Sequence, residues 1–238
     1  MNLILFDTAQ EARYIPSADP RARHIRQVLR MKEGDSLFVG VADGPRGKAV
    51  IVRDTAEGLW LDVSWERQIE PLYPLCVLVG LPRPQTAKDV LRQAATLGIA
   101  QLWFFRPQKG EPSYGDSRLW HTDQWRTLLR EGAQQAFSTG LPQVRHFESL
   151  EAALTAVEPG QGRVALDVYE AGAPLSRCVP DKGALTLAIG AERGWSAQER
   201  TQLRAAQFTL AHLGARVLRT EDALVAGFSV WMTVRGDY

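Results

Sequence analysis

One turn in the second half of the chain has the residue types and spacing of a ligand-binding site. The stretch "LTLAIGAERGWSAQER" runs from an apolar segment through Gly190 and Gly194 to Ser196 and Glu199, whose S-x-x-E spacing predicts a capped helix. A turn from strand to helix points free backbone N–H groups beyond the carboxyl end of the sheet. Most turns of this kind bind no ligand, so the alternative is that this turn only connects a strand to a helix.

Familiar nucleotide signatures do not account for this turn. The sequence has no G-x-x-x-x-G-K-[ST] loop, so ATP hydrolysis is not expected. A dinucleotide fold or a Rossmann-type methyltransferase would need its glycine turn after the first α/β strand, where the chain reads "LVGLPRPQT". A second late turn occurs instead at Gly214 in "HLGARVLRTED". Two late turns, each at a strand end, indicate one ligand held between neighbouring loops.

A basic stretch near the N-terminus is a candidate nucleic-acid surface. The whole chain carries a net charge of only +1, but "RARHIRQVLRMK" holds five Lys or Arg residues and no acid. Val28 and Leu29 are expected in the core. A solvated helix face is the alternative interpretation. The residues expected to meet nucleic-acid phosphates are Arg23, His24, Arg26 and Arg30.

Composition limits the remaining function classes. At 238 residues and 45% hydrophobic content the chain can bury one large or two modest cores. It has no apolar run near the roughly 18 residues of a membrane span and no basic signal sequence, so we expect a cytoplasmic protein without a membrane partner. Cys76, Cys178 and four scattered histidines lack metal spacing. We therefore expect reduced thiols and no metal.

The pattern of elements changes near residue 70. Short β signals joined by glycine turns predict a small antiparallel barrel or sheet over residues 1–70. Pro71 and Pro74 suggest the boundary. Alternating strands and helices over 71–238 predict an α/β domain with a mainly parallel sheet. Within it, Thr86 with Asp89 is expected to cap the helix "AKDVLRQAATLG".

The segments "HIRQVLRMKEGD", "LRQAATLGI", "LPQV", "IGAERGWSAQE" and "LGARVLRTEDA" resemble, in this order, the RsmE-type 16S ribosomal RNA uridine-N3 methyltransferases of the SPOUT superfamily. The resemblance covers nearly the whole chain. Ala191 stands where this family usually has Pro, Arg193 where it has Gly, and Asp222 where it has Thr. Arg193 would be costly if its position required positive φ or close backbone approach.

The resemblance implies a PUA-like RNA-binding barrel in residues 1–70 and a SPOUT-type knotted α/β domain in 71–238. It also implies a homodimer in which "ALVAGFSVWMTV" is a buried helix, 16S rRNA of the small ribosomal subunit as partner, and S-adenosylmethionine as methyl donor, bound against loop backbone in the knot. Carried over by position, the donor-binding residues are Leu166, Ile189, Gly190, Ala191, Glu192, Gly194, Leu213, Gly214, Val217, Leu218 and Thr220.

Two residues of the second turn are candidate catalytic groups. Methylation of uracil N3 displaces a proton and spreads negative charge onto the flanking carbonyls, which Arg219 could stabilise. An ion pair with Glu221 or Asp222 is its structural alternative. Glu221 could orient the base or accept its proton, or only stabilise a helix dipole. Other hypotheses are methylation of a different RNA position and a non-catalytic RNA-binding or ribosome-assembly protein.

Overall fold

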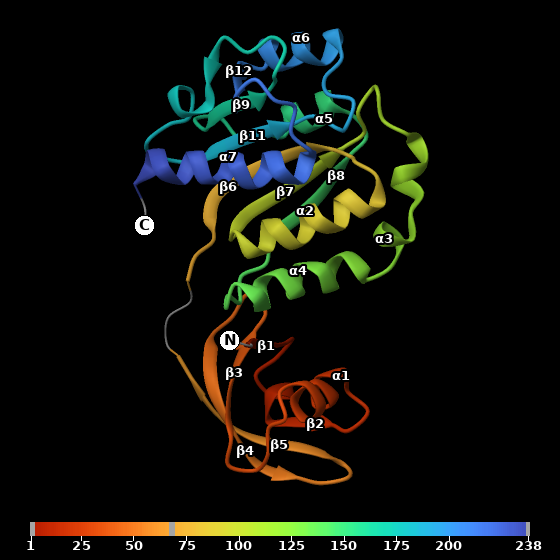
Figure 1. Ribbon diagram of the computed structural model, residues 1–238, viewed down its shortest axis with the longest axis vertical. Helices are drawn as coiled ribbons and strands as arrows, with labels where there is room; N and C mark the ends of the chain where they lie inside the picture. The colour runs from red at the N-terminus through yellow and green to blue at the C-terminus, as the bar shows by residue number, and fades with distance from the viewer. Residues whose placement is uncertain (1–2, 67–69, 237–238) are drawn as a thin grey trace. The chain divides into compact units, whose positions relative to one another are not determined.

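The structure, a computed structural model, describes residues 3–66 and 70–236, and the chain divides into two compact units. The first unit comprises Met1–Pro71 together with Arg130–Leu141. The second comprises Leu72–Leu129 and Pro142–Tyr238. Figure 1 shows the elements of each unit.

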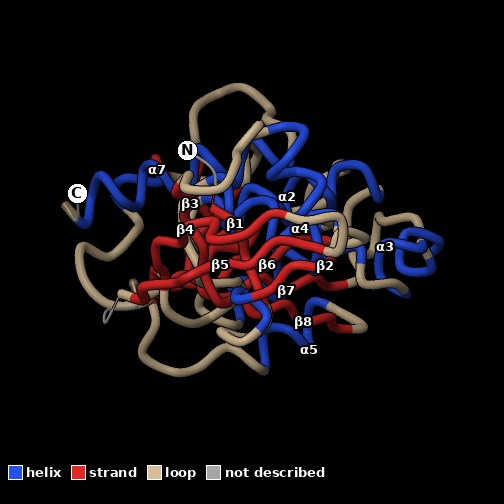
Figure 2. Tube along the Cα trace, turned by 90° about the horizontal axis from the view of Figure 1, so that it is seen from below, coloured by secondary structure: helices blue, strands red, loops and turns tan. Residues whose placement is uncertain are grey.

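The first unit contains a five-stranded sheet. β1 pairs in parallel with β3, whereas the other three pairs are antiparallel, so the predicted antiparallel sheet is correct except at β1. Figure 2 shows β3, β4 and β5 running side by side as red strands. The strands, in spatial order, are β1 (Leu3–Phe6), β3 (Ser36–Val41), β4 (Arg46–Asp54), β5 (Gly58–Trp65) and β2 (Tyr14–Pro16).

The side chains of this sheet alternate between core and solvent. Along β4, Ala49 and Ile51 are buried while Lys48 and Val50 are exposed, as the two-residue period of a strand requires. A register shift after Ile51 lets the strand bend, and the inward side chains close around a single core.

The basic stretch forms a short helix that widens. α1 (Pro20–Arg23) continues as a π-helix over His24–Val28, in which the amide of Leu29 donates to the carbonyl five residues earlier at 3.0 Å. Ile25 is fully buried, but Val28 is 65% exposed. The prediction that Val28 lies in the core is therefore wrong, because the extra residue in the turn rotates it away from the sheet.

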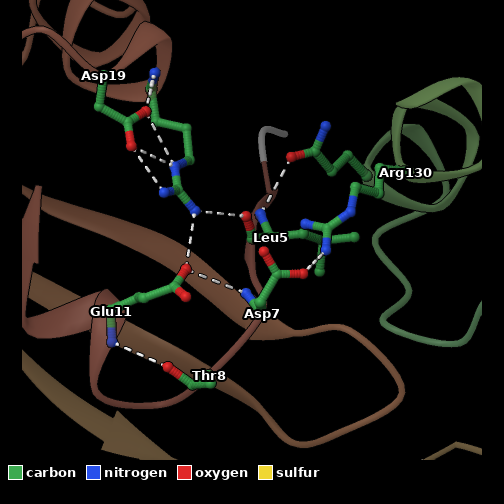
Figure 3. Close-up of polar contacts among 8 residues, drawn as sticks. Leu5, Asp7, Thr8, Glu11, Asp19 and Arg130 are labelled. Carbon is green, nitrogen blue, oxygen red and sulfur yellow. Dashed lines mark hydrogen bonds and ion pairs between the residues drawn. The ribbon is translucent and has the colours of Figure 1, made fainter. Parts of the chain in front are cut away.

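Residues 130–141 belong to the first unit by their contacts. The amide of Leu5 donates to Oε1 of Gln134 at 3.0 Å, and the guanidinium of Arg130 forms an ion pair with Asp7 (Figure 3). The hydroxyl of Thr139 donates to the carbonyl of Gly44 at 2.7 Å. A division of the chain at residue 70 alone leaves this segment out, because its contacts are distant in sequence.

The second unit is built on a seven-stranded sheet in which every pair is parallel. The spatial order of the strands differs from their order in the chain, since β11 pairs between β9 and β6 while β12 pairs on the far side of β9. In spatial order the strands are β10 (Ala173–Pro174), β12 (Thr209–His212), β9 (Gly162–Leu166), β11 (Leu185–Ile189), β6 (Tyr73–Gly80), β7 (Ile99–Phe105) and β8 (Gln143–Phe147).

Helices cover both faces of this sheet (Figure 1). Cys76 and Leu78 share a buried cluster with side chains of α5 and α6. α7 returns to the opposite face, where a Cβ on Gly227 would lie 2.9 Å from the Leu187 side chain of β11. The helices of the unit are α2 (Pro84–Thr96), α3 (Arg118–His121), α4 (Gln124–Gln135, whose last residues belong to the first unit), α5 (Leu150–Thr155), α6 (Ala197–Ala205) and α7 (Thr220–Arg235).

The start of α2 differs from the prediction. The helix begins at Pro84, and its N-cap residue Arg83 makes no capping hydrogen bond through its side chain. Thr86 instead accepts a hydrogen bond from Nε of Arg83 at 3.2 Å. The predicted Thr86 cap is wrong because Pro84 has the φ of a first helical residue and needs no N–H partner there.

The other predicted cap is confirmed. The hydroxyl of Ser196 accepts from the amide of Glu199 at 3.0 Å, and Oε2 of Glu199 accepts from the amide of Ser196 at 2.7 Å. Glu199 is only 1% exposed, and its Oε1 accepts from the amide of Gln108 at 3.0 Å. The capping box therefore also joins α6 to the loop after β7.

Candidate functional site

A pocket of about 490 Å³ lies where β9, β11 and β12 end, within the second unit. The carboxyl ends of parallel strands meet at one edge of a sheet, so the loops that follow these strands converge there. We call residues 190–195 the first loop and residues 213–219 the second loop. All the predicted donor-binding residues line this pocket, together with Arg219 and Glu221.

The first loop turns sharply after β11. Gly194 has a φ of +61°, and its amide donates to the carbonyl of Ala191 at 2.8 Å. A Cβ on Gly190 would lie 3.3 Å from the backbone of Gly194, so the turn is tight at both glycines. Positive φ falls on Gly194, and Arg193 has none. The expected conflict at Arg193 does not occur, because the neighbouring glycine adopts the left-handed conformation.

Hydrogen bonds from neighbouring elements hold the first loop in place. Oε1 of Glu192 accepts from the amide of Arg83 at 2.9 Å. The indole N–H of Trp195 donates to the carbonyl of Leu166 at 2.8 Å, and Nζ of Lys109 donates to the carbonyl of Trp195 at 3.0 Å. Glu192 therefore orders the loop against the start of α2.

The second loop is far more exposed. Val217 is 69% and Leu218 40% exposed, although both line the pocket. Gly214 has a φ of +114°, and its amide donates to Nδ1 of His212 at 3.1 Å. The loop ends at Thr220, which is buried at the start of α7.

A buried ion pair forms one wall of the pocket. Asp167 follows β9 directly, its side chain is 1% exposed, and its Oδ2 accepts from Nε of Arg200 in α6. The amides of Tyr169 and Glu170 donate to Oδ1 at 2.6 and 3.2 Å. Burial raises the pKa of Asp167, but the hydrogen bonds from Arg200 and the two amides outweigh it, so the pKa lies below its usual value.

The sequence analysis missed this wall of the pocket. Asp167, Tyr169, Trp195 and Arg200 all line the pocket and were not among the predicted site residues. Asp167 could have been found, because a carboxylate placed directly after the apolar strand "RVAL" lies at the ligand-binding edge of a parallel sheet. Nothing local in the sequence pairs Arg200 with it.

The two catalytic candidates lie at the N-terminus of α7. Arg219 is exposed, and neither Glu221 nor Asp222 forms an ion pair with it among the described residues. Oε2 of Glu221 is buried without a hydrogen-bond partner at the pocket wall. The first intrahelical bond runs from Ala223 to Arg219, so the helix does not use the preceding amides. The pocket thus combines an exposed cation, a carboxylate and, at the start of α7, N–H groups that the helix does not use.

The predicted RNA-binding residues lie in the first unit and differ in their contacts. Arg23 and Arg30 are exposed, and His24 is half-buried. Arg26 donates to Oδ1 of Asp54 at 2.6 Å and to the hydroxyl of Ser17 at 2.7 Å. These contacts give Arg26 a structural role that the sequence did not predict.

Arg21, in the same stretch, is held in a similar way. Its guanidinium pairs with Asp19 at 2.7 Å, lies 3.7 Å from Glu11, and donates to the carbonyl of Leu5 at 3.3 Å (Figure 3). Arg23 and Arg30 are consequently the better placed cations of this stretch for an external phosphate.

Two classes of feature are not found in the part of the chain that the structure describes. Between residues 3 and 66 and between 70 and 236, no helix is both long and apolar enough to cross a membrane. The same ranges contain no group of three or more His, Cys, Asp or Glu side chains placed to hold a metal ion.

Comparison with known proteins identifies the family. Residues 68–232 match the family described as RNA methyltransferase domain, and residues 18–64 match the RNA methyltransferase PUA domain. The chain is 32% identical to the ribosomal RNA small subunit methyltransferase E of Treponema pallidum over 97% of this chain and 90% of that protein. It is 23% identical to ribosomal RNA small subunit methyltransferase E 1 of Borreliella burgdorferi, over 95% of each chain.

Solved structures show the same fold. A ribosomal RNA small subunit methyltransferase E from Neisseria gonorrhoeae, crystallised bound to S-adenosyl methionine, aligns with a TM-score of 0.81 at 17% identity, covering 98% of both chains. A probable rRNA methyltransferase from Porphyromonas gingivalis aligns with a TM-score of 0.82 at 20% identity over 99% of both. From its sequence matches, this chain belongs to the ribosomal RNA small subunit methyltransferase E family of PUA-containing RNA methyltransferases.

Proposed function

We propose that this protein transfers the methyl group of S-adenosylmethionine to N3 of a uridine in 16S ribosomal RNA of the small subunit. The observation that carries the proposal is the single pocket formed by the first and second loops, which gathers every residue that the family resemblance assigns to donor binding. The relatives' names supply the RNA class, and the Neisseria structure supplies the donor.

The residues of the pocket fit such a donor. Leu166, Ile189 and Leu218 provide apolar walls for a flat adenine ring, and the unused amides at the start of α7 suit a carboxylate. When bound, the donor supplies an electrophilic methyl group on a positively charged sulfur. The loops' part is to hold that methyl group toward the uracil.

Arg219 and Glu221 would then act on the base. As the bond from N3 to the methyl carbon forms and the sulfur–methyl bond breaks, the N3 proton must leave, and negative charge develops on the uracil carbonyls. Arg219, free of an ion pair to Glu221 or Asp222 within the described residues, would stabilise that charge. The buried, unpartnered oxygen of Glu221 is the group that we assign to orient the base or accept the proton.

RNA binding would extend to the first unit through Arg23, His24 and Arg30, with Arg26 supporting this surface from behind through Asp54. We also propose a homodimer in which part of α7 is buried, since Val225 on this helix is 36% exposed. An enzyme acting on small ribosomal subunits would work in the cytoplasm.

The test is to incubate the protein with labelled S-adenosylmethionine and small subunits lacking the modification, then to digest the RNA and identify the labelled nucleoside. N3-methyluridine is expected. A different methylated nucleoside would replace the target while keeping the donor. Absence of both label and donor binding would contradict the proposal and favour a non-catalytic RNA-binding or assembly protein. We do not expect that outcome, because the donor pocket is intact.

A further inference from the structure

A second cavity, of about 320 Å³, lies at another part of the same sheet edge. It is formed where β6, β7 and β8 end, beside α3 and the start of α4. None of its lining residues belongs to the donor pocket. Its walls are mainly aromatic, so we call it the aromatic pocket, and the residues that matter here are Phe104, Arg106, Trp120, Trp125, His146 and Phe147.

Three of its rings form a connected cluster. His146 is stacked on Phe104 with ring centres 5.5 Å apart and an interplanar angle of 23°. Trp120 makes a T-shaped contact with His146, with ring centres 4.5 Å apart, and a tilted contact with Phe104 at 5.0 Å. His146 lies on β8, the edge strand of the sheet, and is exposed. The cluster therefore combines a braced set of rings with an accessible imidazole.

The polar groups of the aromatic pocket indicate what kind of flat ligand would fit. The indole N–H of Trp120 is buried without a hydrogen-bond partner, so it lacks the acceptor that a buried donor normally has. Arg106 is half-exposed and forms a 3.3 Å pair with Glu148, whose side chain is 84% exposed. Although His146 is exposed as a residue, its ring packs against Phe104 and Trp120, and the shielding of the ring from water lowers its pKa, which favours a neutral imidazole at pH 7.

We infer that the aromatic pocket binds one unpaired nucleobase of the RNA substrate, near the nucleotide that is methylated. An unpaired nucleotide offers a flat base for the imidazole and indole rings and a carbonyl oxygen or ring nitrogen as acceptor for the Trp120 N–H. It also offers a backbone phosphate, which Arg106 can reach by exchanging Glu148 for it. An aliphatic side chain would leave the indole N–H unpaired.

The position of the aromatic pocket supports this occupant. β11, which leads into the first loop, is separated from β7 only by β6, and neighbouring strands lie about 4.8 Å apart. Two such steps are roughly 10 Å, which a strand of RNA crosses within a few nucleotides. The inference rests on the proposed function, because it takes the RNA of that reaction as the ligand.

The experiment uses the full-length protein and compares the variants His146→Ala and Trp120→Phe with the wild type and with a control variant, His121→Ala. His121 is an exposed residue of α3 that does not line the aromatic pocket. Filter binding without donor gives the Kd for unmodified 16S RNA, steady-state kinetics give KM for RNA and kcat, and calorimetry gives the Kd for S-adenosylmethionine.

We expect His146→Ala to weaken RNA binding by about fivefold to a hundredfold, the range for loss of one stacking partner, with unchanged donor affinity. Trp120→Phe keeps a ring but removes the N–H, so a smaller loss is expected. Unchanged RNA Kd and KM in both variants would overturn the inference. So would a loss of RNA affinity in His121→Ala equal to the loss in His146→Ala.

Failure of the proposed function is distinguishable, because RNA binding is measured without methyl transfer. A wild-type protein that binds RNA but transfers no methyl group contradicts only the proposed function. Photo-crosslinking of 4-thiouridine-substituted RNA locates the contact directly: peptides from α3 or β8 are expected. A crosslink found only elsewhere, or wild-type protein that binds no RNA, overturns the inference.

Discussion

The two loops that enclose the donor pocket are held very differently. The first loop is tied to α2, β9 and the loop after β7 by Glu192, by the Trp195 indole and by Lys109. The second loop leaves Val217 and Leu218 largely exposed. Both follow parallel strands and both begin with glycine-containing turns, so local sequence does not explain the contrast.

The contrast indicates a division of labour within the pocket. A loop with many buried contacts is preorganised, whereas one with few contacts lies at the low end of local stability and can be ordered by what it binds. We therefore expect the first loop and the Asp167 wall to determine the shape of the pocket. The second loop, which carries Arg219, would respond to donor and RNA.

The largest expected effect is a loss of stability when Arg200, the buried cation of the Asp167 wall, is removed. Arg200→Ala leaves the Asp167 carboxylate buried without its partner, and we expect the free energy of unfolding to fall by about 3–5 kcal/mol. Arg204→Ala is the matched control, since its 2.6 Å pair with Glu170 is half-exposed and should be worth at most about 1 kcal/mol. Urea unfolding measures both. Equal losses would mean that the Asp167 wall is not rigid in the proposed sense.

In the second loop, we expect removal of Arg219 to slow methyl transfer rather than to lower stability. Arg219→Ala should lower kcat by roughly a hundredfold or more, as loss of a group that stabilises developing charge does, while donor affinity changes little. Methyl transfer and calorimetric donor binding give the two quantities, and Arg219→Lys tests whether charge alone suffices. Wild-type turnover by Arg219→Ala would remove Arg219 from the mechanism.

Acid should lower the free energy of unfolding by protonating Asp167. The loss should be smaller than in Arg200→Ala, because a protonated carboxyl can still accept hydrogen bonds. The folded pKa of Asp167 lies below its unfolded value of about 3.9. Its contribution to stability is therefore complete above that value and is lost as pH falls from about 4 through the folded pKa. Unfolding free energies between pH 3 and 6 should fall less steeply in Asp167→Asn than in wild type. Parallel curves would contradict the assignment.

The smallest expected effect concerns the link from the first loop to α2. Glu192→Ala removes the acceptor for the Arg83 amide and should cost about 1 kcal/mol or less, with a donor Kd raised a few-fold. Glu192→Gln keeps a carbonyl oxygen and should remain close to wild type. If the two variants weaken donor binding equally, the carboxylate charge rather than the hydrogen bond matters.

Much of this molecule could be predicted before its structure was known. The strand and helix periods, the Ser196–Glu199 capping box and the parallel sheet are local or nearly local properties, because side-chain spacing alone sets which face is buried. The two loops were predicted from their glycines and from the family resemblance. Errors arose where an adjacent residue changed the local geometry, as Pro84 did at α2 and the π-helix did at Val28.

The sequence by itself determined which segments form the two loops, which residues they present and the family to which the chain belongs. Only the tertiary structure decided that Asp167 pairs with Arg200 and Arg26 with Asp54. It also decided that residues 130–141 pack with the first unit, and that the first loop is held by hydrogen bonds while the second is exposed. The physical reason is that these contacts join residues far apart along the chain. Charge pairing and burial depend on where the fold places each group, which no local pattern of residue types specifies.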